Sequence, residues 1–130
     1  MSSFKMGTRS NTHLAKVDPK LAEVVRLALT YTKFDFGVVC SLRTNEEQLD
    51  LLRRGLTTTL KSKHLANSEG LSEAVDIVVY NEKGKHTFKR AYYSKVAQAM
   101  FKAAIELGVE LEWGGHWFSL FDGPHYQINK

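Results

Sequence analysis

The order of helical and strand patterns along the chain predicts an α+β fold. Apolar residues recur at helical spacing from Leu21 to Leu29 and again over residues 94–107. Short runs rich in β-branched and aromatic residues, at 34–40 and 74–80, are typical of buried strands. A chain of 130 residues can bury a single core. Because no repeat or linker interrupts it, we expect one domain over residues 1–130.

Two helices are predicted in the first half of the chain, one on each side of a strand. Asp18 suits the N-cap of the first helix, and Pro19 suits its first position. The strand follows at 34–40. Thr44 and Glu47 then form a capping-box pattern that opens a helix running to residue 54, where Gly55 stops it. The buried stripe expected on the first helix consists of Leu21, Val24, Val25, Ala28 and Leu29.

The second half begins with a polar segment at 56–73, long enough to be a functional loop. A strand at 74–80 and a turn at 81–85 follow. Gly108 ends the helix predicted over 94–107, and strands at 109–113 and 125–128 complete the sheet. The inner face expected on that helix consists of Val96, Ala97, Met100, Phe101, Ala104 and Ile105.

Two histidines and two carboxylates suggest a metal-dependent hydrolase. Asp76 lies within an apolar strand, where a carboxylate is costly unless it is paired or coordinated. His64 and His125 could join one carboxylate as zinc ligands and leave the fourth position open for water. The remaining carboxylate, Asp122 or Asp76, would then be free to act as a base. Each histidine alone is more often solvated, because a metal site needs several converging groups.

These residues occur in a family order. Residues 62–64 read Ser-Lys-His, 74–76 read Ala-Val-Asp, 113–117 read Trp-Gly-Gly-His-Trp, and 122–125 read Asp-Gly-Pro-His. The pattern resembles that of the phage L-alanyl-D-glutamate peptidases, within the zinc D-alanyl-D-alanine carboxypeptidase and hedgehog-domain superfamily. The resemblance extends through residues 4–10, 17–21 and 41–44. It implies the superfamily fold, in which helices pack against an antiparallel sheet.

The resemblance also implies roles for individual residues. His64, Asp76 and His125 would bind one Zn²⁺ per chain, and Asp122 would act as general base and then general acid. Arg43 would bind substrate or stabilise a developing oxyanion. Ser62 would support the site as a hydrogen-bond donor. The two tryptophans are more often core or cleft wall than specific contacts, and as cleft walls they would join Ser62 at the substrate: Ser62, Trp113 and Trp117.

The chain departs from the family pattern in two places. Eleven residues separate His64 from Asp76, whereas the family usually has about six, so residues 65–73 contain an insertion. Glu69 and Glu73 in this loop are alternative ligands or substrate contacts. His116 stands where the family commonly has aspartate. It is interpreted as an extra metal contact, a partner of a metal-binding residue, or a local substitution, and we favour the last two.

The resemblance implies a zinc endopeptidase that cuts the stem peptide of bacterial peptidoglycan at the L-alanyl-D-glutamate bond, acting as a phage endolysin. Two alternatives remain. One is a D,D- or L,D-carboxypeptidase on the same scaffold, and the other is a metal-containing module that binds cell wall without cleaving it. We expect a monomer that stays in the host bacterial cytoplasm until release and then acts in the periplasm and cell wall. Residues 1–6 lack the apolar core of a secretory signal.

Composition argues against other classes of partner. The net charge is +4, but the basic residues are dispersed, and neither a basic helix face nor zinc-finger spacing is present. We therefore expect no specific nucleic-acid partner. No apolar stretch approaches about 18 residues, so we expect no membrane insertion. Cys40 is the only cysteine, which excludes an intrachain disulfide and predicts a buried, inert thiol.

Overall fold

The computed structural model describes residues 3–57, 59–117 and 121–129. These residues form an α+β fold with an antiparallel sheet, as predicted. The elements in chain order are α1 (Thr8–Leu14), α2 (Pro19–Tyr31), β1 (Phe36–Cys40), α3 (Asn45–Arg53), β2 (Ala74–Tyr80), β3 (His86–Thr87), α4 (Arg90–Leu107), β4 (Leu111–Trp113), the 3₁₀ turn η1 (Gly114–His116) and β5 (His125–Ile128).

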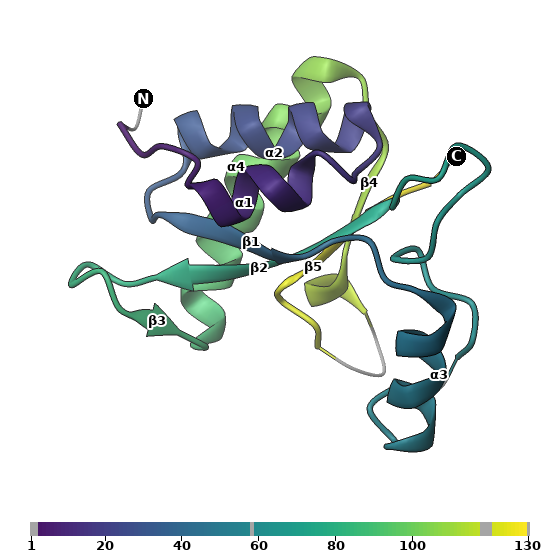
Figure 1. Cartoon of the computed structure of the whole chain (residues 1–130). Helices are drawn as coiled ribbons and strands as arrows, with labels where there is room; N and C mark the ends of the chain where they lie inside the picture. Colours follow the sequence, from purple (N-terminus) through teal and green to yellow (C-terminus); the bar gives the residue numbers. More distant parts are fainter. Residues whose placement is uncertain (1–2, 58, 118–120, 130) are drawn as a thin grey trace.

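The sheet brings together strands that are far apart in the sequence. Its order is β1-β2-β5-β4, β3 pairs with the free part of β2, and every pairing is antiparallel. Helices α2 and α4 pack against each other, and α1 lies along β1 (Figure 1). Helix α3 is set apart from these three. The middle strands β2 and β5 therefore carry residues 74–80 and 125–128 side by side.

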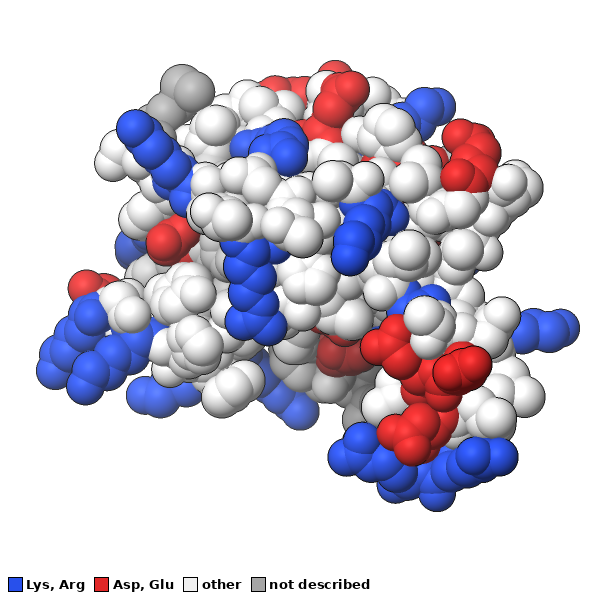
Figure 2. Space-filling model, in the orientation of Figure 1, with Lys and Arg blue, Asp and Glu red and all other residues white. Residues whose placement is uncertain are grey.

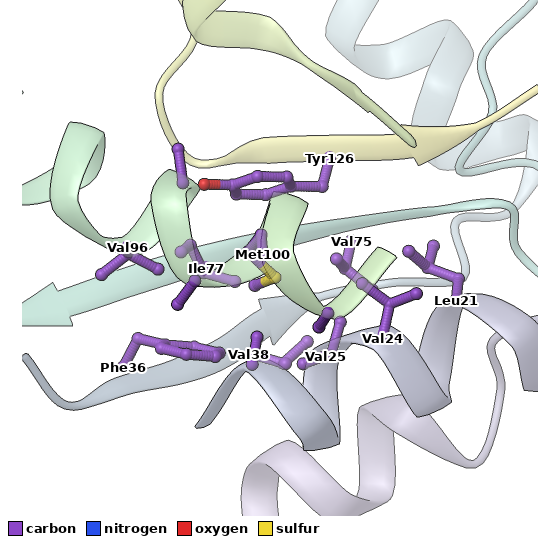
Figure 3. Close-up of a cluster of buried hydrophobic side chains, with 14 of the residues drawn as sticks. Leu21, Val24, Val25, Phe36, Val38, Val75, Ile77, Val96, Met100 and Tyr126 are labelled. Atoms are coloured by element: carbon purple, nitrogen blue, oxygen red, sulfur yellow. The ribbon is translucent and has the colours of Figure 1, made fainter. Parts of the chain in front are cut away.

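The core lies between α2, α4 and one face of the sheet (Figure 3). All five residues of the stripe predicted on α2 are buried. On β2, Val75, Ile77 and Val79 are also buried and belong to this core. Each such side chain contributes about 1.5–3 kcal/mol when fully buried. Because side chains alternate along a strand, the core face of β2 turns Asp76 toward the opposite face.

Some element boundaries differ from the prediction. Helix α4 begins at Arg90 rather than at 94, β1 begins at Phe36 rather than at 34, and β4 begins at Leu111 rather than at 109. Gly108 does end α4, in the left-handed conformation with φ of 67°. The prediction for Ile105 was wrong, because its side chain is 79% exposed. The buried stripe of α4 follows the neighbouring positions Met100, Ala103 and Ala104, which leaves Ile105 on the outer flank.

Two elements were not predicted, because their sequences carry little periodicity. Helix α1 is short and mostly polar, with only Ser10 and Leu14 buried. It covers the outer edge of β1, where the backbone N–H of Val38 donates to Ser10 Oγ at 2.9 Å. Strand β3 has only two residues and follows the predicted turn.

Helix α3 confirms the capping box. The N–H of Glu47 donates to Thr44 Oγ1 at 3.0 Å, and the N–H of Thr44 donates to Glu47 Oε1 at 2.9 Å. The only fully buried residue of this helix is polar, Gln48. In the view of Figure 2, acidic side chains gather over α3 with a group of basic side chains directly below them, and other basic side chains are scattered over the visible face.

Within the described part of the chain, we find no helix that has both the length and the apolar character needed to cross a membrane.

Candidate active site

Three neighbouring strands place Cys40, Asp76 and His125 in one row across the sheet. Asp76 of β2 is paired with His125 of β5 on one side and with Cys40 of β1 on the other. The β1 pairing is irregular between Val38 and Cys40. Without this bulge, Cys40 would point into the core with Val38, because side chains alternate along a strand. The bulge brings Cys40 to the face that carries Asp76.

His64 reaches the same place from the long loop. Its backbone carbonyl accepts a hydrogen bond from the N–H of Arg43 at 2.8 Å, which attaches the loop to the segment after β1. The N–H of His64 donates to Ser62 Oγ at 3.1 Å. The side chain of His64 is nearly inaccessible, with the residue only 2% exposed. A polar loop with no regular secondary structure thus delivers a buried histidine.

Asp76 lies between the two histidines that were predicted to join it. His64 Nε2 is 3.2 Å from Asp76 Oδ2, and His125 Nδ1 is 3.2 Å from Asp76 Oδ1. The two imidazole rings meet edge to face, with centroids 5.1 Å apart. The structure therefore brings all three predicted metal ligands together.

The protonation of His64 indicates that a cation belongs in this cluster. Its Nδ1–H donates to the backbone carbonyl of Ser41 at 2.7 Å, so the neutral ring presents the Nε2 lone pair to Asp76. Nε2 is buried and has no hydrogen-bond partner within the described residues. A lone pair and a carboxylate oxygen 3.2 Å apart repel unless a positive charge lies between them. A metal ion would supply that charge, and the donor set fits one.

A proton can supply the charge when no metal is bound. Burial opposes the charged form of His64, but the hydrogen bond and charge of Asp76 outweigh it and raise the pKa of His64 to about 9. Burial likewise opposes the charged form of Asp76. The hydrogen bonds and charges of His125 and His64 outweigh that burial and hold the pKa of Asp76 well below its usual range. The cluster thus holds ionised Asp76 beside a positive charge in either form.

The second histidine has a similar arrangement. His125 Nε2 is 2.8 Å from Gln127 Oε1, and with the proton on Nε2 the Nδ1 lone pair faces Asp76. The Trp117 ring packs against the other side of His125, with centroids 5.0 Å apart. Gln127 was not singled out from the sequence, although its position two residues after His125 on one strand places both side chains on the same face.

Cys40 differs from the inert core thiol that was predicted. It is half-buried, and its Sγ lies 4.0 Å from His64 Nδ1. One donor atom each from Cys40, His64 and Asp76 lie within 4.8 Å of one another, so these three residues could also hold a metal ion. The prediction failed because the bulge in β1 reverses the direction of this side chain. The bulge cannot be recognised from the sequence.

The cluster opens into a cleft of about 690 Å³. Ser62 lines this cleft, and its Oγ accepts a hydrogen bond from the backbone N–H of His64 at 3.1 Å. Six residues singled out from the sequence line this cleft: Arg43, Ser62, His64, Trp117, Asp122 and His125.

Arg43 is held rigidly at this cleft. Its guanidinium donates from one terminal nitrogen to Gln48 Oε1 at 2.7 Å, and the other nitrogen lies 3.8 Å from Cys40 Sγ. Gln48 is buried and donates in turn to the carbonyl of Thr59 at 2.8 Å. The single buried residue of α3 therefore connects Arg43 to the loop that lines the cleft.

The two glycines of residues 114–115 allow the chain to fold back and seat Asp122. The N–H of Asp122 donates to the carbonyl of Gly114 at 3.0 Å. A Cβ on Gly114 would collide with the Asp122 backbone, and one on Gly115 would collide with the Trp113 ring. Burial, and then the nearby charge of Asp76, raise the pKa of Asp122 above its usual value, against the opposing effect of the two histidines. The pKa of Asp122 is therefore sensitive to the charges of Asp76, His64 and His125.

Trp113 and His116 lie beside the cleft rather than in it. Of the two positions considered for Trp113, core and cleft wall at the substrate, it takes the core. It is 6% exposed, packs against Tyr126, and donates from Nε1 to the carbonyl of Gly123 at 2.8 Å. It ends β4 on the core face of the sheet. The His116 ring stacks on Phe101 and contacts Trp113, which matches a local substitution.

The inserted loop is tied to the body of the protein. Glu73 accepts from Asn67 Nδ2 at 3.0 Å and pairs with Lys63 Nζ at 3.3 Å. Glu69 is exposed. Buried Ser72 places its Oγ 3.1 Å from the Ser41 carbonyl, the same carbonyl that accepts from His64. Neither Ser41 nor Ser72 was singled out, because their contacts join segments about 30 residues apart.

An antiparallel sheet with a buried His–Asp–His cluster at the floor of a cleft defines a candidate metallopeptidase. Comparison with known proteins agrees. Residues 1–128 match the family model described as phage L-alanyl-D-glutamate peptidase. The chain belongs to this family, and the enzyme class predicted from the sequence is confirmed.

Individual relatives are similar over most of the chain. The L-alanyl-D-glutamate peptidase of Escherichia phage T5 is 34% identical, covering 97% of this chain and 98% of the relative. The L-alanyl-D-glutamate peptidase of Listeria phage A118 is 35% identical over 68% of this chain, but the match covers only 28% of that longer protein. The crystal structure of the Serratia marcescens L-Ala D-Glu endopeptidase ChiX has a TM-score of 0.87 at 37% identity, covering 98% of this chain and 92% of that one.

Proposed function

We propose that the chain hydrolyses the L-alanyl-D-glutamate bond of the peptidoglycan stem peptide with one zinc ion bound by His64, Asp76 and His125. The family assignment supports the peptidase activity. One observation carries the metal: in neutral His64 the buried Nε2 lone pair faces an Asp76 oxygen at 3.2 Å. A zinc ion bound there supplies a Lewis acid that polarises a carbonyl and makes water nucleophilic near neutral pH.

His125 is a better third ligand than Cys40. The Cys40 sulfur is near Nδ1 of His64, the nitrogen that already donates to Ser41. His125 Nδ1 instead approaches Asp76 on the side of the open cleft, as His64 Nε2 approaches the other carboxylate oxygen. Two imidazole nitrogens and one carboxylate leave room for substrate, whereas a fourth protein ligand would close the site.

Asp122 is the proton-transfer residue of this proposal. It lines the cleft together with His64 and His125. It would take a proton from the attacking water and deliver it to the leaving amine of glutamate. Burial raises the pKa of Asp122 above its usual value, which makes its carboxylate a stronger base toward the attacking water.

Arg43 and Trp117 would hold the substrate. The D-glutamate residue of the stem peptide is acidic, and Arg43 presents a fixed cation at the cleft. Trp117 offers an apolar wall for the peptide. Such an enzyme acts on the host cell wall as an endolysin. It would remain in the bacterial cytoplasm until release and then reach the periplasm and wall.

The ligand assignment is tested by zinc content. Wild-type protein, Cys40→Ser and His125→Ala are loaded with zinc, freed of excess metal and analysed by elemental mass spectrometry. We expect one zinc per chain in wild-type and Cys40→Ser, and little in His125→Ala. Retention by His125→Ala together with loss from Cys40→Ser would replace His125 with Cys40 in the ligand set.

A further inference from the structure

Trp117 restricts the movement of His125. The two rings have centroids 5.0 Å apart, with their planes inclined by 44°. Trp117 is half-buried directly after η1 and lines the cleft. A large aromatic ring packed this closely leaves the imidazole less space in which to turn. The orientation of Trp117 therefore affects the direction in which His125 Nδ1 points.

Glu112 fixes that orientation. The indole Nε1–H of Trp117 donates to Glu112 Oε2 at 2.6 Å, a short hydrogen bond of the charge-assisted kind. The other carboxylate oxygen accepts from Asn129 Nδ2 at 3.2 Å. Glu112 lies within β4, so the indole is anchored to the sheet rather than to its own loop. The other tryptophan, Trp113, uses only a backbone carbonyl for the same purpose.

Strand pairing connects Glu112, the partner of Trp117, to Gln127, which contacts His125 at its other ring nitrogen. Glu112 of β4 is paired directly with Gln127 of β5. Gln127 Oε1 accepts from His125 Nε2 at 2.8 Å. The imidazole is thus held in its plane by Gln127 and on its face by Trp117, and Nδ1 is left directed at Asp76.

We propose that Glu112 is a positioning residue for the metal site, acting through Trp117 on His125. This inference rests on the proposed zinc-binding role of His125. Glu112 does not line the cleft, so it affects the site through the tryptophan and not by touching substrate. Outer partners of metal-binding histidines typically change metal affinity or activity by about 10–100-fold when removed.

The test compares Glu112→Ala and Glu112→Gln with Glu110→Ala, an exposed acidic residue that directly precedes the same strand. Zinc release from each loaded protein is timed with a chromophoric chelator. The two indole N–H signals are followed by ¹H–¹⁵N NMR, and the chain has only two tryptophans. Trp113 serves as an internal control, because its N–H partner is the Gly123 carbonyl.

In Glu112→Ala, we expect the Trp117 indole signal to move and to exchange faster with solvent while the Trp113 signal stays. Zinc release should accelerate by about tenfold or more. Glu112→Gln keeps an acceptor without the charge, so release should accelerate only about two- to fivefold. Glu110→Ala should match wild type. If Glu112→Ala does not fold, Glu112→Gln carries the same comparison.

Zinc release from both Glu112 variants at the Glu110→Ala rate, with the Trp117 signal displaced, would overturn the positioning role and leave the proposed function standing. Displacement of both indole signals together would mean that Glu112 supports the fold in general, which also overturns the inference. A folded wild-type protein that binds no zinc would overturn the inference and the proposed function together.

Discussion

Among single residues, Asp122 distinguishes the proposed proton transfer from the proposed metal binding. Asp122 lines the cleft beside His64 and His125, but it is not one of the three proposed zinc ligands. The substitution Asp122→Asn keeps the size and shape of the side chain but removes the carboxylate that is proposed as the general base. We expect kcat to fall by about 10²- to 10⁴-fold while zinc content stays at the wild-type value. The measurements are initial rates on a stem-peptide substrate and elemental analysis of the same samples.

Near-normal turnover by Asp122→Asn would remove Asp122 from the mechanism. Loss of zinc from this variant would instead make Asp122 a ligand. Either result contradicts the role proposed here.

A substitution at Gly114 tests whether the close approach of the Asp122 backbone to Gly114 is needed for activity. A Cβ at this position would collide with the Asp122 carbonyl oxygen and come within 2.8 Å of its Cβ, so the acidic residue must move. We expect Gly114→Ala to lose at least about tenfold in kcat/KM, because a misplacement of about 1 Å can cost 10²-fold. Gly7→Ala is the matched control, since nothing lies within 4 Å of a Cβ there. Equal activity of the two variants would show that this close approach is unimportant.

At the scale of the element, the inserted loop is a fixed part of the fold. Asn67 Oδ1 accepts from the N–H groups of Glu69 and Leu71, and Asn67 Nδ2 donates to Glu73. Glu73 also pairs with Lys63. Through these contacts Glu73 holds the loop in place, whereas the sequence suggested a metal ligand or a substrate contact.

We therefore expect Glu73→Gln to keep its zinc and to turn over substrate within about twofold of wild type. Its unfolding free energy should fall by about 0.5–1.5 kcal/mol, as is typical when one hydrogen-bonded polar contact is weakened. Urea denaturation and zinc analysis test this together. A variant that loses its zinc would make Glu73 a ligand after all.

The elements also show why some features could be predicted and others could not. The stripe on α2 and the position of Asp76 follow from local periodicity, so they were predictable. The direction of Cys40 depends on a β-bulge, and the burial of Trp113 depends on which face of β4 meets the core. The contacts of Ser41, Glu112 and Gln127 depend on strand register, which single-residue patterns do not encode.

For the molecule as a whole, the proposed metal binding would be coupled to folding. The cluster joins β2, β5 and the long loop, so an ion there binds the folded chain and not the unfolded one. At a free zinc concentration of about 100 times Kd, the ion stabilises the fold by about 2.7 kcal/mol. Removal of zinc should therefore lower Tm by about 10 °C in a domain of this size.

Thermal unfolding with and without a chelator measures this shift. His64→Ala is the control and should melt at one temperature in both conditions. Equal melting temperatures for the wild-type protein would show that no stabilising ion is bound to the native state.

The most direct test of the central claim is the digestion of purified sacculi by zinc-loaded wild-type protein and by Asp122→Asn, followed by mass analysis of the released peptides. We expect wild-type protein to leave new carboxylates on L-alanine and new amino groups on D-glutamate. A chelator should abolish this release, and zinc-loaded Asp122→Asn should give almost none. Intact sacculi after treatment with the zinc-loaded wild type, or cleavage at a different bond, would contradict the central claim.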